Sequence, residues 1–282
     1  MALLLHVLML VLLSGGSAEV VENFEWECGQ FFANRKSPTI FSGPQYKQIC
    51  QTLNGVPYYA TYYDTGNKIP VYSAYRFRGL QSCKRKNWYI EPQLDDTNAV
   101  SNMSSEGSVD INLRGVHQAL SEDYKKSGYH KGHLAPVYQA GSQSCADATF
   151  TLTNAAPQDR FFNNGKWKSL ERKIANDLVK QCLNLEYSVF IVTGVVPGTG
   201  TLKNENRVKV PSHFWTAYCC LDNNNKCQTS RGYIGENKNE TPLNMTVKEL
   251  ETYLATLYEV RSFEVFPTPA YIVEIDQYRA YY

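Results

Sequence analysis

Runs of aromatic and β-branched residues set the expected strands of this chain. They predict strands within 56–64, 68–79, 148–158, 187–198 and 213–221. Thr65-Gly66-Asn67 joins the first two runs and is typical of a tight turn. The last two runs (YSVFIVTGVVPG and HFWTAYCCL) are almost wholly apolar, which indicates buried strands. The 148–158 strand is expected to end near its proline.

Helical spacing predicts the remaining elements. Apolar residues recur at intervals of three and four over 163–183, at Trp167, Leu170, Ile174 and Leu178. The segment 246–258 begins with a capping box between Thr246 and Glu249. A third segment, 116–128, has helical composition, and 89–113 is polar enough to be a long surface loop. Strands and helices alternate without a regular βαβ pattern, so the expected class is α+β, with helices flanking a mixed or antiparallel sheet.

Residues 1–18 (MALLLHVLMLVLLSGGSA) are uncharged, apolar through Leu13 and small thereafter. This pattern is typical of a secretory signal peptide cleaved before Glu19. The apolar stretch is shorter than the ~20 residues that span a bilayer, although the missing N-terminal positive charge leaves an uncleaved anchor as the alternative. We expect a secreted, extracellular protein with no membrane partner.

The residues after the signal peptide number 264 (282 minus 18), enough to bury a substantial core. No Gly/Ser-rich or Pro-rich linker divides them, and no internal repeat is present. We therefore expect a Cys-containing N-terminal extension over 19–55 followed by one domain over 56–282. The oligomeric state stays open, with a monomer as one option.

Eight cysteines all lie after the signal peptide, an even number that in an oxidising compartment predicts four disulfides of open pairing. Cys219 and Cys220 are adjacent in an expected strand, where side chains alternate, so they should pair with different partners. A zinc site is the alternative, although no C-x-x-C pair occurs. Sequons at Asn102, Asn239 and Asn244 also predict a glycoprotein of the secretory route.

The net charge of +1 gives no general attraction for polyanions, so an anionic ligand needs a local basic patch. Candidate cations lie in the CKRKNW segment, 83–88, and at Lys125, Lys126, Lys166, Lys168, Arg172 and Lys173. Each of them is equally compatible with an ordinary solvated surface.

The segment GYHKGHLAP, 128–136, holds two of the five histidines. A neutral imidazole such as that of His133 can take a proton from water, which suits a general base. His130 and His133 as a metal-binding pair are the alternative, but H-x-x-H without a third ligand is a weak signal.

The expected helix over 163–183 supplies a second group of candidate residues. Asn163 and Glu171 are eight residues apart, a net rotation of ~80° on a helix, so both side chains can reach one flank. An amide oxygen and a carboxylate, completed by waters, are hard ligands of the kind that Mg²⁺ accepts. A base beside a Mg²⁺ site provides the parts for phosphodiester hydrolysis.

Three ordered motifs, GYHKGHLAP, FTLTNAAPQ and FNNGKWKSLE, resemble the DNA/RNA non-specific endonucleases of the ββα-metal (His-Me finger) fold. The family pattern is Asp-Arg-Gly-His, then Asn-x-x-Pro-Gln, then Asn-x-Gly-x-Trp-x-x-x-Glu. The last two motifs match in full, from Asn154 and from Asn163. The start of the chain and YATYYDTGNKIPVYSAYRF are similar, within this family, to secreted endonuclease domain-containing-1-like proteins. The resemblance covers most of the chain from about Cys28 and makes 56–282 the endonuclease domain.

The resemblance implies that His133 activates the attacking water. Asn163 would be the one direct protein ligand of a single Mg²⁺ or Mn²⁺ ion, and Glu171 would hold the waters around it. The metal would stabilise the departing 3′ oxygen and leave a 5′-phosphate. Arg76 would contact the substrate phosphate, and Lys131 would be a further catalytic residue. Trp167 and Leu170 would form the core face of the helix, and Asn154 would fix the strand-to-helix turn.

The chain departs from the family pattern beside the expected base. His130 stands where the family has Asp and brings no negative charge, a change that by precedent costs about 10–100-fold in metal affinity or activity. Lys131 keeps the charge of the family Arg but not its planar fork. Ala175 stands where the family often has a basic residue.

Three functions therefore stay open. The first is a secreted, metal-dependent nuclease that hydrolyses DNA, RNA or both through backbone contacts, without sequence specificity. The second is a catalytically impaired nuclease fold that binds nucleic acid or a protein partner. The third is a disulfide-stapled extracellular interaction module that uses the fold as a scaffold.

Overall fold

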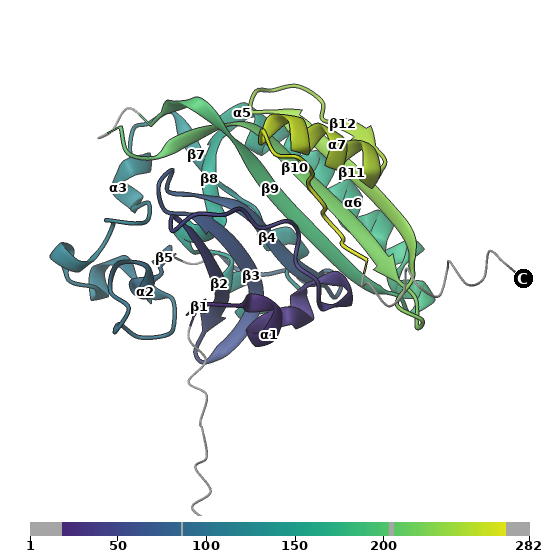
Figure 1. Cartoon of the computed structure of the whole chain (residues 1–282), viewed down its shortest axis with the longest axis horizontal. Helices are drawn as coiled ribbons and strands as arrows, with labels where there is room; N and C mark the ends of the chain where they lie inside the picture. The colour runs from purple at the N-terminus through teal and green to yellow at the C-terminus, as the bar shows by residue number, and fades with distance from the viewer. Residues whose placement is uncertain (1–18, 86, 203–205, 269–282) are drawn as a thin grey trace, which may run out of the picture.

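A long antiparallel sheet carries the fold (Figure 1). A computed structural model describes residues 19–85, 87–202 and 206–268, and the expected signal peptide, 1–18, lies outside them. The sheet runs in the order β1-β2-β3-β4-β9-β10-β11-β12, and every neighbouring pair is antiparallel. Its strands are β1 (Val20–Val21), β2 (Tyr46–Leu53), β3 (Val56–Asp64), β4 (Ile69–Phe77), β9 (Ser188–Thr201), β10 (Lys209–Leu221), β11 (Cys227–Glu236) and β12 (Leu243–Met245). The expected α+β class is confirmed.

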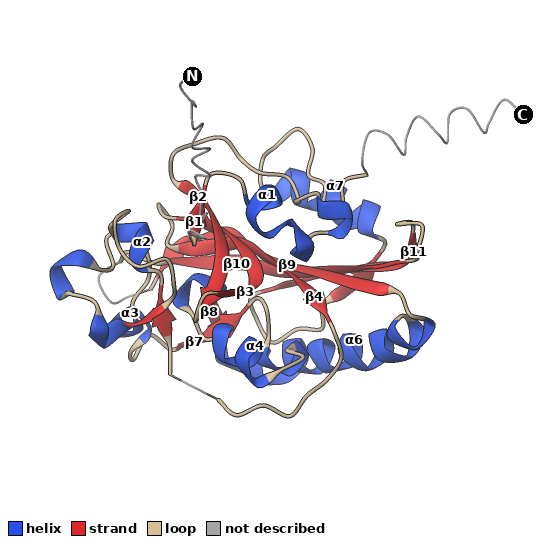
Figure 2. Cartoon of the chain, turned by 90° about the horizontal axis from the view of Figure 1, so that it is seen from below, coloured by secondary structure: helices blue, strands red, loops and turns tan. Residues whose placement is uncertain are grey.

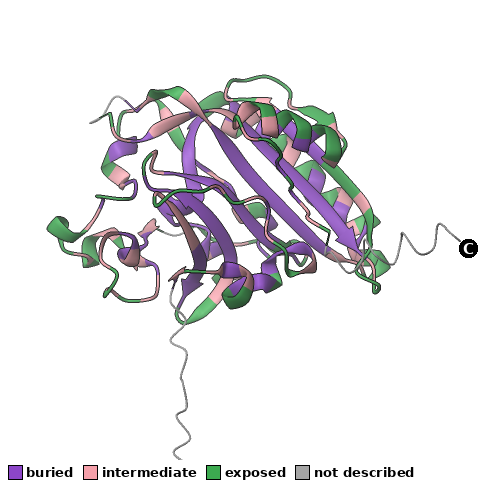
Figure 3. Cartoon of the chain, viewed as in Figure 1, coloured by how far each residue is buried: buried purple, intermediate pink, exposed green. Residues whose placement is uncertain are grey.

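Helices cover both faces of this sheet (Figure 2). One face carries α1 (Phe24–Cys28) and α7 (Val247–Leu257), and the other carries α4 (Gln143–Ala148) and α6 (Lys168–Gln181). Because side chains alternate along a strand, β9 and β10 need apolar residues at nearly every position to face both layers. Both strands are buried over most of their length in Figure 3, as are β3 and β4.

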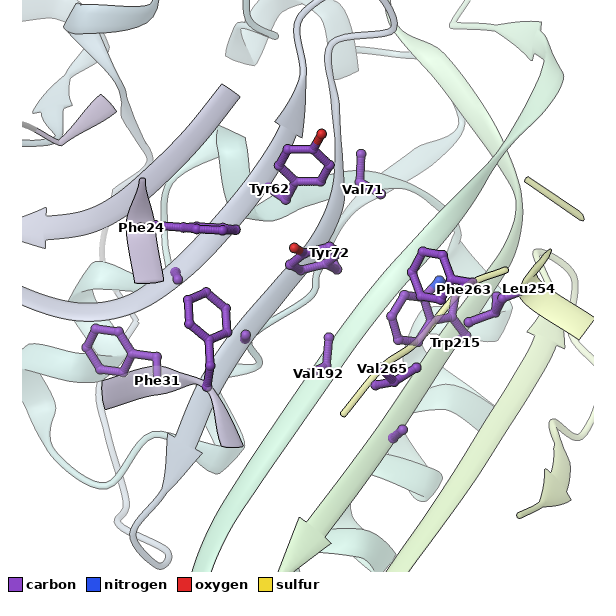
Figure 4. Close-up of a cluster of buried hydrophobic side chains, with 14 of the residues drawn as sticks. Phe24, Phe31, Tyr62, Val71, Tyr72, Val192, Trp215, Leu254, Phe263 and Val265 are labelled. Carbon is purple, nitrogen blue, oxygen red and sulfur yellow. The ribbon is translucent and has the colours of Figure 1, made fainter. Parts of the chain in front are cut away.

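Two apolar clusters result from this alternation. On the α1/α7 face, Val192 and Trp215 pack with Tyr72, Leu254 and Phe263 (Figure 4). On the α6 face, the neighbouring strand positions pack against Ile174, Ala175 and Leu178 of the helix, at Tyr75, Ile191 and Tyr218. The helical spacing within 163–183 is thus the buried stripe of α6.

The N-terminal region contributes to the same sheet. Strand β2 pairs with β3 from Tyr46 opposite Asp64 to Leu53 opposite Val56. The boundary between 55 and 56 that the sequence suggests therefore falls inside a β-hairpin. The extension and the rest of the chain share one hydrogen-bonded layer.

The connection from β4 to β9, residues 78–187, holds the three motifs. It contains the elements β5 (Tyr89–Ile90), α2 (Pro92–Asp95), β6 (Ser104–Ser105), α3 (Ser121–Tyr124), β7 (Tyr129–His133), α4, β8 (Ala155–Asp159), α5 (Arg160–Phe162) and α6. Strands β7 and β8 form a separate antiparallel pair, and α5 continues through a π-helical turn, Asn163–Trp167, into α6. This order is the expected ββα motif.

Two expected elements are shorter in the structure. The segment 116–128 is helical only over Ser121–Tyr124, because Lys125 turns to an extended backbone and closes the helix. The strand expected over 148–158 begins only at Ala155, after a 3₁₀ turn at Leu152–Asn154. The helix expected at 246–258 is confirmed as α7, with the capping box at Thr246 and Glu249.

Three disulfides form among the described residues: Cys28–Cys50, Cys182–Cys220 and Cys219–Cys227. As expected, Cys219 and Cys220 bond to different partners, since they point to opposite faces of β10. The expected fourth disulfide is wrong for this structure: Cys83, in the loop after β4, and Cys145, on α4, carry free thiols. An even number of cysteines gives complete disulfide pairing only when the fold also brings the last two sulfur atoms together.

Among the described residues, no helix combines the length and the apolar character that a membrane crossing requires.

Candidate active site

A close contact between β7 and β8 positions the histidine motif. Gly132 lies opposite Ala156, and a Cβ atom at Gly132 would come within 2.4 Å of the Gln158 Oε1 atom and 2.6 Å of its Cβ atom. Only glycine fits at this point without displacing Gln158. The contact sets His133 at the end of β7, where its side chain lines a groove.

Asn154 fastens the backbone that follows His133. Its buried side-chain oxygen accepts hydrogen bonds from the Ala135 amide and the Ser73 hydroxyl, both at 2.9 Å. Its side-chain nitrogen donates to the carbonyl oxygens of Ala135, at 3.0 Å, and Thr149, at 2.9 Å. Instead of the expected strand-to-helix turn, Asn154 ties the segment after His133 to strand β4.

The imidazole of His133 lies among aromatic rings and cations. Its ring centroid is 4.8 Å from that of Trp88 and 4.9 Å from that of Phe150. Burial, together with the charges of Arg85 and Lys131, lowers the pKa of His133 to about 3. The Nε2 atom is buried and has no hydrogen-bond partner among the described residues. His133 is thus a neutral imidazole with a nitrogen available to a ligand.

Asn163 and Glu171 line the same groove as His133. Asn163 opens the π-helical turn, so the ~80° offset expected for a regular helix does not describe its relation to Glu171. The turn, a form that often occurs at functional sites, nevertheless leaves both side chains on the groove. The structure therefore brings together the three residues that the sequence proposes for a base and a metal site.

A buried hydrogen-bond chain holds the helix around Glu171. The Tyr75 hydroxyl donates to the Gln139 side-chain oxygen at 2.6 Å, and the Gln139 amide donates to the Glu171 carbonyl oxygen at 3.0 Å. Burial raises the pKa of the Glu171 carboxyl to about 8, against the opposing charges of Lys168 and Arg172. The carboxyl lies in a setting where a cation would be a favourable neighbour.

Three connected pockets, of about 540, 550 and 660 Å³, make up the groove. The first two share Arg85, His133, Asn163 and Asn164, and the second and third share His130 and Asn164. Among the described residues, the acidic Glu122 and Glu171 and six basic residues line the three pockets. The basic residues are Arg85, Lys125, Lys131, Arg160, Lys168 and Arg172. A chain of nearly neutral net charge thus concentrates positive charge at this groove.

Lys131 and His130 both lie on the groove, in different settings. The Lys131 ammonium lies 5.0 Å from the ring centroid of Trp88 and 5.8 Å from that of Tyr124, and it donates to the Ser121 hydroxyl at 3.0 Å. Burial lowers the pKa of Lys131. His130 is exposed and lines the second and third pockets.

Arg76 is not brought to this groove. Alternation along β4 places Tyr75 on the α6 face and Arg76 on the other, where it bonds the Ser188 hydroxyl at 2.9 Å and lies over the Phe190 ring. Arg85 lines the first two pockets beside His133 instead. The sequence signal for Arg85 is the basic CKRKNW segment, which does not single out one of its three cations.

The donor atoms of the groove suit a hard cation. No group of three or more His, Cys, Asp or Glu side chains that could hold a metal occurs in the described part of the chain. The groove offers an amide oxygen at Asn163 and a carboxylate at Glu171, the kind of small oxygen set that Mg²⁺ uses while keeping most of its waters. The residues fit such an ion.

Comparisons with known proteins agree with this geometry. Residues 37–265, more than half of the chain, match the profile of the DNA/RNA non-specific endonucleases. The human endonuclease domain-containing 1 protein is 36% identical over 200 residues, which are 69% of this chain and 39% of that protein. Human mitochondrial endonuclease G is 33% identical over 118 residues, 38% of each chain. The chain thus spans well under half the length of these relatives.

A solved structure shows the same fold. The crystal structure of an EndoG/EndoGI complex contains a chain that superposes with a TM-score of 0.52 over 85% of this chain and 91% of that chain, at 20% identity. The match of the family profile over 37–265 establishes that the chain belongs to the DNA/RNA non-specific endonuclease family, and the three motifs gathered on one groove agree with it.

Proposed function

We propose that the protein is a secreted, metal-dependent endonuclease that hydrolyses phosphodiester bonds of DNA, RNA or both without sequence specificity. The observation that carries the proposal is the unpartnered Nε2 atom of His133, which lies on a basic groove together with Asn163 and Glu171. A buried imidazole nitrogen without a partner costs stability and is explained if a ligand or water completes it. The basic lining favours a phosphate backbone as that ligand.

In this proposal His133 is the general base. Its low pKa keeps the imidazole neutral at physiological pH, so Nε2 can accept a proton from the attacking water. Arg85, on the same pockets, binds the substrate phosphate and places it near His133. Because phosphate contacts carry no sequence information, the cleavage is independent of base sequence.

Asn163 and Glu171 would hold one divalent cation, Mg²⁺ or Mn²⁺, Asn163 directly and Glu171 through water. When bound, the ion supplies positive charge that stabilises the charge building up on the phosphate and on the departing oxygen. Because burial raises the pKa of Glu171 to about 8, binding of the ion would go with loss of the carboxyl proton, and the carboxylate would then supply negative charge beside the ion.

Secretion is supported by the three disulfides, because such bonds form and persist in oxidising compartments. The enzyme for assay is therefore taken from the medium of secreting cells, where sequencing should find Glu19 as its first residue.

One observation favours a second function. His130, exposed on the groove, supplies no carboxylate beside Asn163, so the metal site is short of one negative charge relative to the family pattern. A catalytically impaired protein that still binds nucleic acid is the alternative.

A nicking assay on plasmid DNA and a degradation assay on RNA, each with Mg²⁺, Mn²⁺ or EDTA, separate these functions. We expect metal-dependent cleavage by the native protein, a loss of about 10²-fold or more in His133→Ala, and normal cleavage in the matched control His213→Ala, which lies beside α7. His130→Asp should raise the activity by about 10–100-fold, while His130→Asn, which adds no charge, should not.

Cleavage by His130→Asp alone would support the impaired protein. If neither the native protein nor any variant cleaves, His130→Asp included, the groove is not a catalytic site.

A further inference from the structure

Two exposed aromatic side chains line different pockets of the connected groove. Tyr138 lines only the first pocket and is 38% exposed, and Phe161 lines only the third and is 58% exposed. His133 and Asn163 both line the first and second pockets, and Asn164 lines all three. An aromatic ring left in water on a basic groove is available for contact with a ligand.

Each of these rings has an arginine over it. The Arg172 guanidinium lies 5.4 Å from the Tyr138 ring centroid, and the Arg160 guanidinium lies 4.6 Å from that of Phe161. The cation covers part of one face and leaves the exposed remainder of the ring to a planar ligand, while it adds positive charge beside that ligand. A nucleotide offers both partners at this spacing, a flat base for the ring and a phosphate for the arginine.

We propose that Tyr138 and Phe161 are stacking platforms for nucleobases on the two sides of the scissile phosphate, so that the preferred substrate is a single strand. This inference rests on the proposed function, which assigns the groove to nucleic acid, and it adds that the bound nucleic acid is single-stranded. A duplex keeps its bases stacked and paired, and presenting them to the two rings would require unstacking at a cost of a few kcal/mol. A single strand offers the bases directly.

The residues around the two rings favour nucleobases over a protein partner as their ligand. The two ring–arginine pairs share the groove with four further basic residues and with the unpartnered Nε2 atom of His133. Exposed aromatics elsewhere lack this setting: Trp26, 81% exposed, and Tyr253, 43% exposed, lie on α1 and α7, across the sheet from the groove.

The test measures binding without cleavage. Fluorescence anisotropy in EDTA, on a His133→Ala background, compares three labelled probes: a short single-stranded oligonucleotide, a strand of the same length with abasic sugars, and the duplex. Asn239, which lines the third pocket and heads a sequon, is changed to Gln in all proteins so that a glycan cannot obscure Phe161.

We expect the single strand to bind on the order of a hundredfold more tightly than the abasic strand and the duplex, because stacking on each of the two rings adds about tenfold in affinity. Tyr138→Ala and Phe161→Ala should each remove about tenfold of this affinity for the single strand only. Tyr138→Trp and Phe161→Trp should keep it, and the matched control Tyr253→Ala should change nothing. Phe161→Leu and Tyr138→Leu, which keep apolar volume without a ring, should behave like the alanine variants and guard against misfolding.

Equal affinity for the base-bearing and abasic strands, or unchanged binding in the ring-deletion variants, would overturn the proposal and leave these rings to a protein partner or to surface packing. The outcome is independent of catalysis. If binding depends on the two rings but the protein never cleaves, the stacking proposal stands and the proposed nuclease activity is wrong. If the protein cleaves but binding does not depend on the rings, the nuclease activity stands and the stacking proposal is wrong.

Discussion

His133 illustrates how a neighbourhood sets the chemistry of one side chain. Two aromatic rings remove water from the imidazole, and the charges of Arg85 and Lys131 oppose its protonation, so the pKa of His133 is lowered to about 3. Such a base is always neutral at physiological pH but weakly basic. A bound phosphate would offset the two cations and raise the pKa of His133 toward a useful value, which would link proton uptake to substrate binding.

The protonation of His133 can be followed directly by NMR in the metal-free protein. We expect its ring signals to stay constant from about pH 8 to pH 5, because the imidazole is neutral throughout this range. Arg85→Gln removes a positive charge that disfavours imidazolium, so the pKa of His133 should rise. The matched change Arg76→Gln, on the other face of the sheet, should leave it unchanged. A His133 that titrates near its unperturbed value in the native protein would contradict this account.

At the scale of elements, the β7–β8 pair and α6 form one unit whose spacing depends on small contacts. Gly132 leaves room for the Gln158 side chain on the neighbouring strand, and Asn154 bonds the backbone after His133. The π-helical turn then brings Asn163 to the same groove. Gly132 and Asn154 thus have structural roles beside the proposed base and metal ligands.

Gly132→Ala tests this spacing. The new methyl group would meet Gln158 well inside van der Waals distance, so we expect a loss of about 1–3 kcal/mol in the free energy of unfolding, together with weaker cleavage. Denaturant unfolding measures the first effect. Gly200→Ala, in β9, is the matched control, because a Cβ atom there meets nothing within 4 Å. Equal stability of the two variants would show that the strands adjust to the added group.

At the scale of the whole molecule, the crossover that carries the site is joined to the N-terminal strands through buried carboxyls. The Glu19 side chain accepts from the Thr52 amide at 3.2 Å, and Glu91 accepts from Thr151 at 2.8 Å and Thr153 at 3.0 Å. Burial is the main cause that raises the pKa of both glutamates, and the two carboxyls also interact with each other. The buried contact between Glu19 and Glu91 therefore favours the protonated form of these carboxyls.

The raised pKa of the buried Glu91 makes the stability of the fold depend on pH. A carboxyl whose pKa is raised on folding binds its proton more tightly in the folded state, so its contribution is complete below the unfolded pKa of ~4.3 and is lost as pH rises through the folded pKa. Glu91→Gln removes this loss. The melting temperature of the variant relative to native should therefore rise between about pH 5 and pH 8, as measured by calorimetry. The exposed Glu27→Gln is the control, and a constant difference across this range would refute the prediction.

Local patterns in the sequence were sufficient for much of this molecule. The strands β3, β4, β9 and β10 and the helices α6 and α7 follow from periodicity, turn residues and a capping box, which act between near neighbours. The three motifs likewise carry the family and the candidate base, because their residue types and spacing are read along the chain. The sequence therefore suffices to predict His133, Asn163 and Glu171 as candidate site residues.

Long-range contacts decided the rest. Strand β2 belongs to the central sheet because of its pairing with β3, although its own sequence has little periodicity. The cysteine pairs depend on which sulfur atoms meet, so Cys83 and Cys145 stay free despite the even count. Arg85, not Arg76, lies beside His133, because strand alternation turns Arg76 to the opposite face of the sheet. Such choices depend on where distant segments are brought together, and no local pattern of residues encodes that.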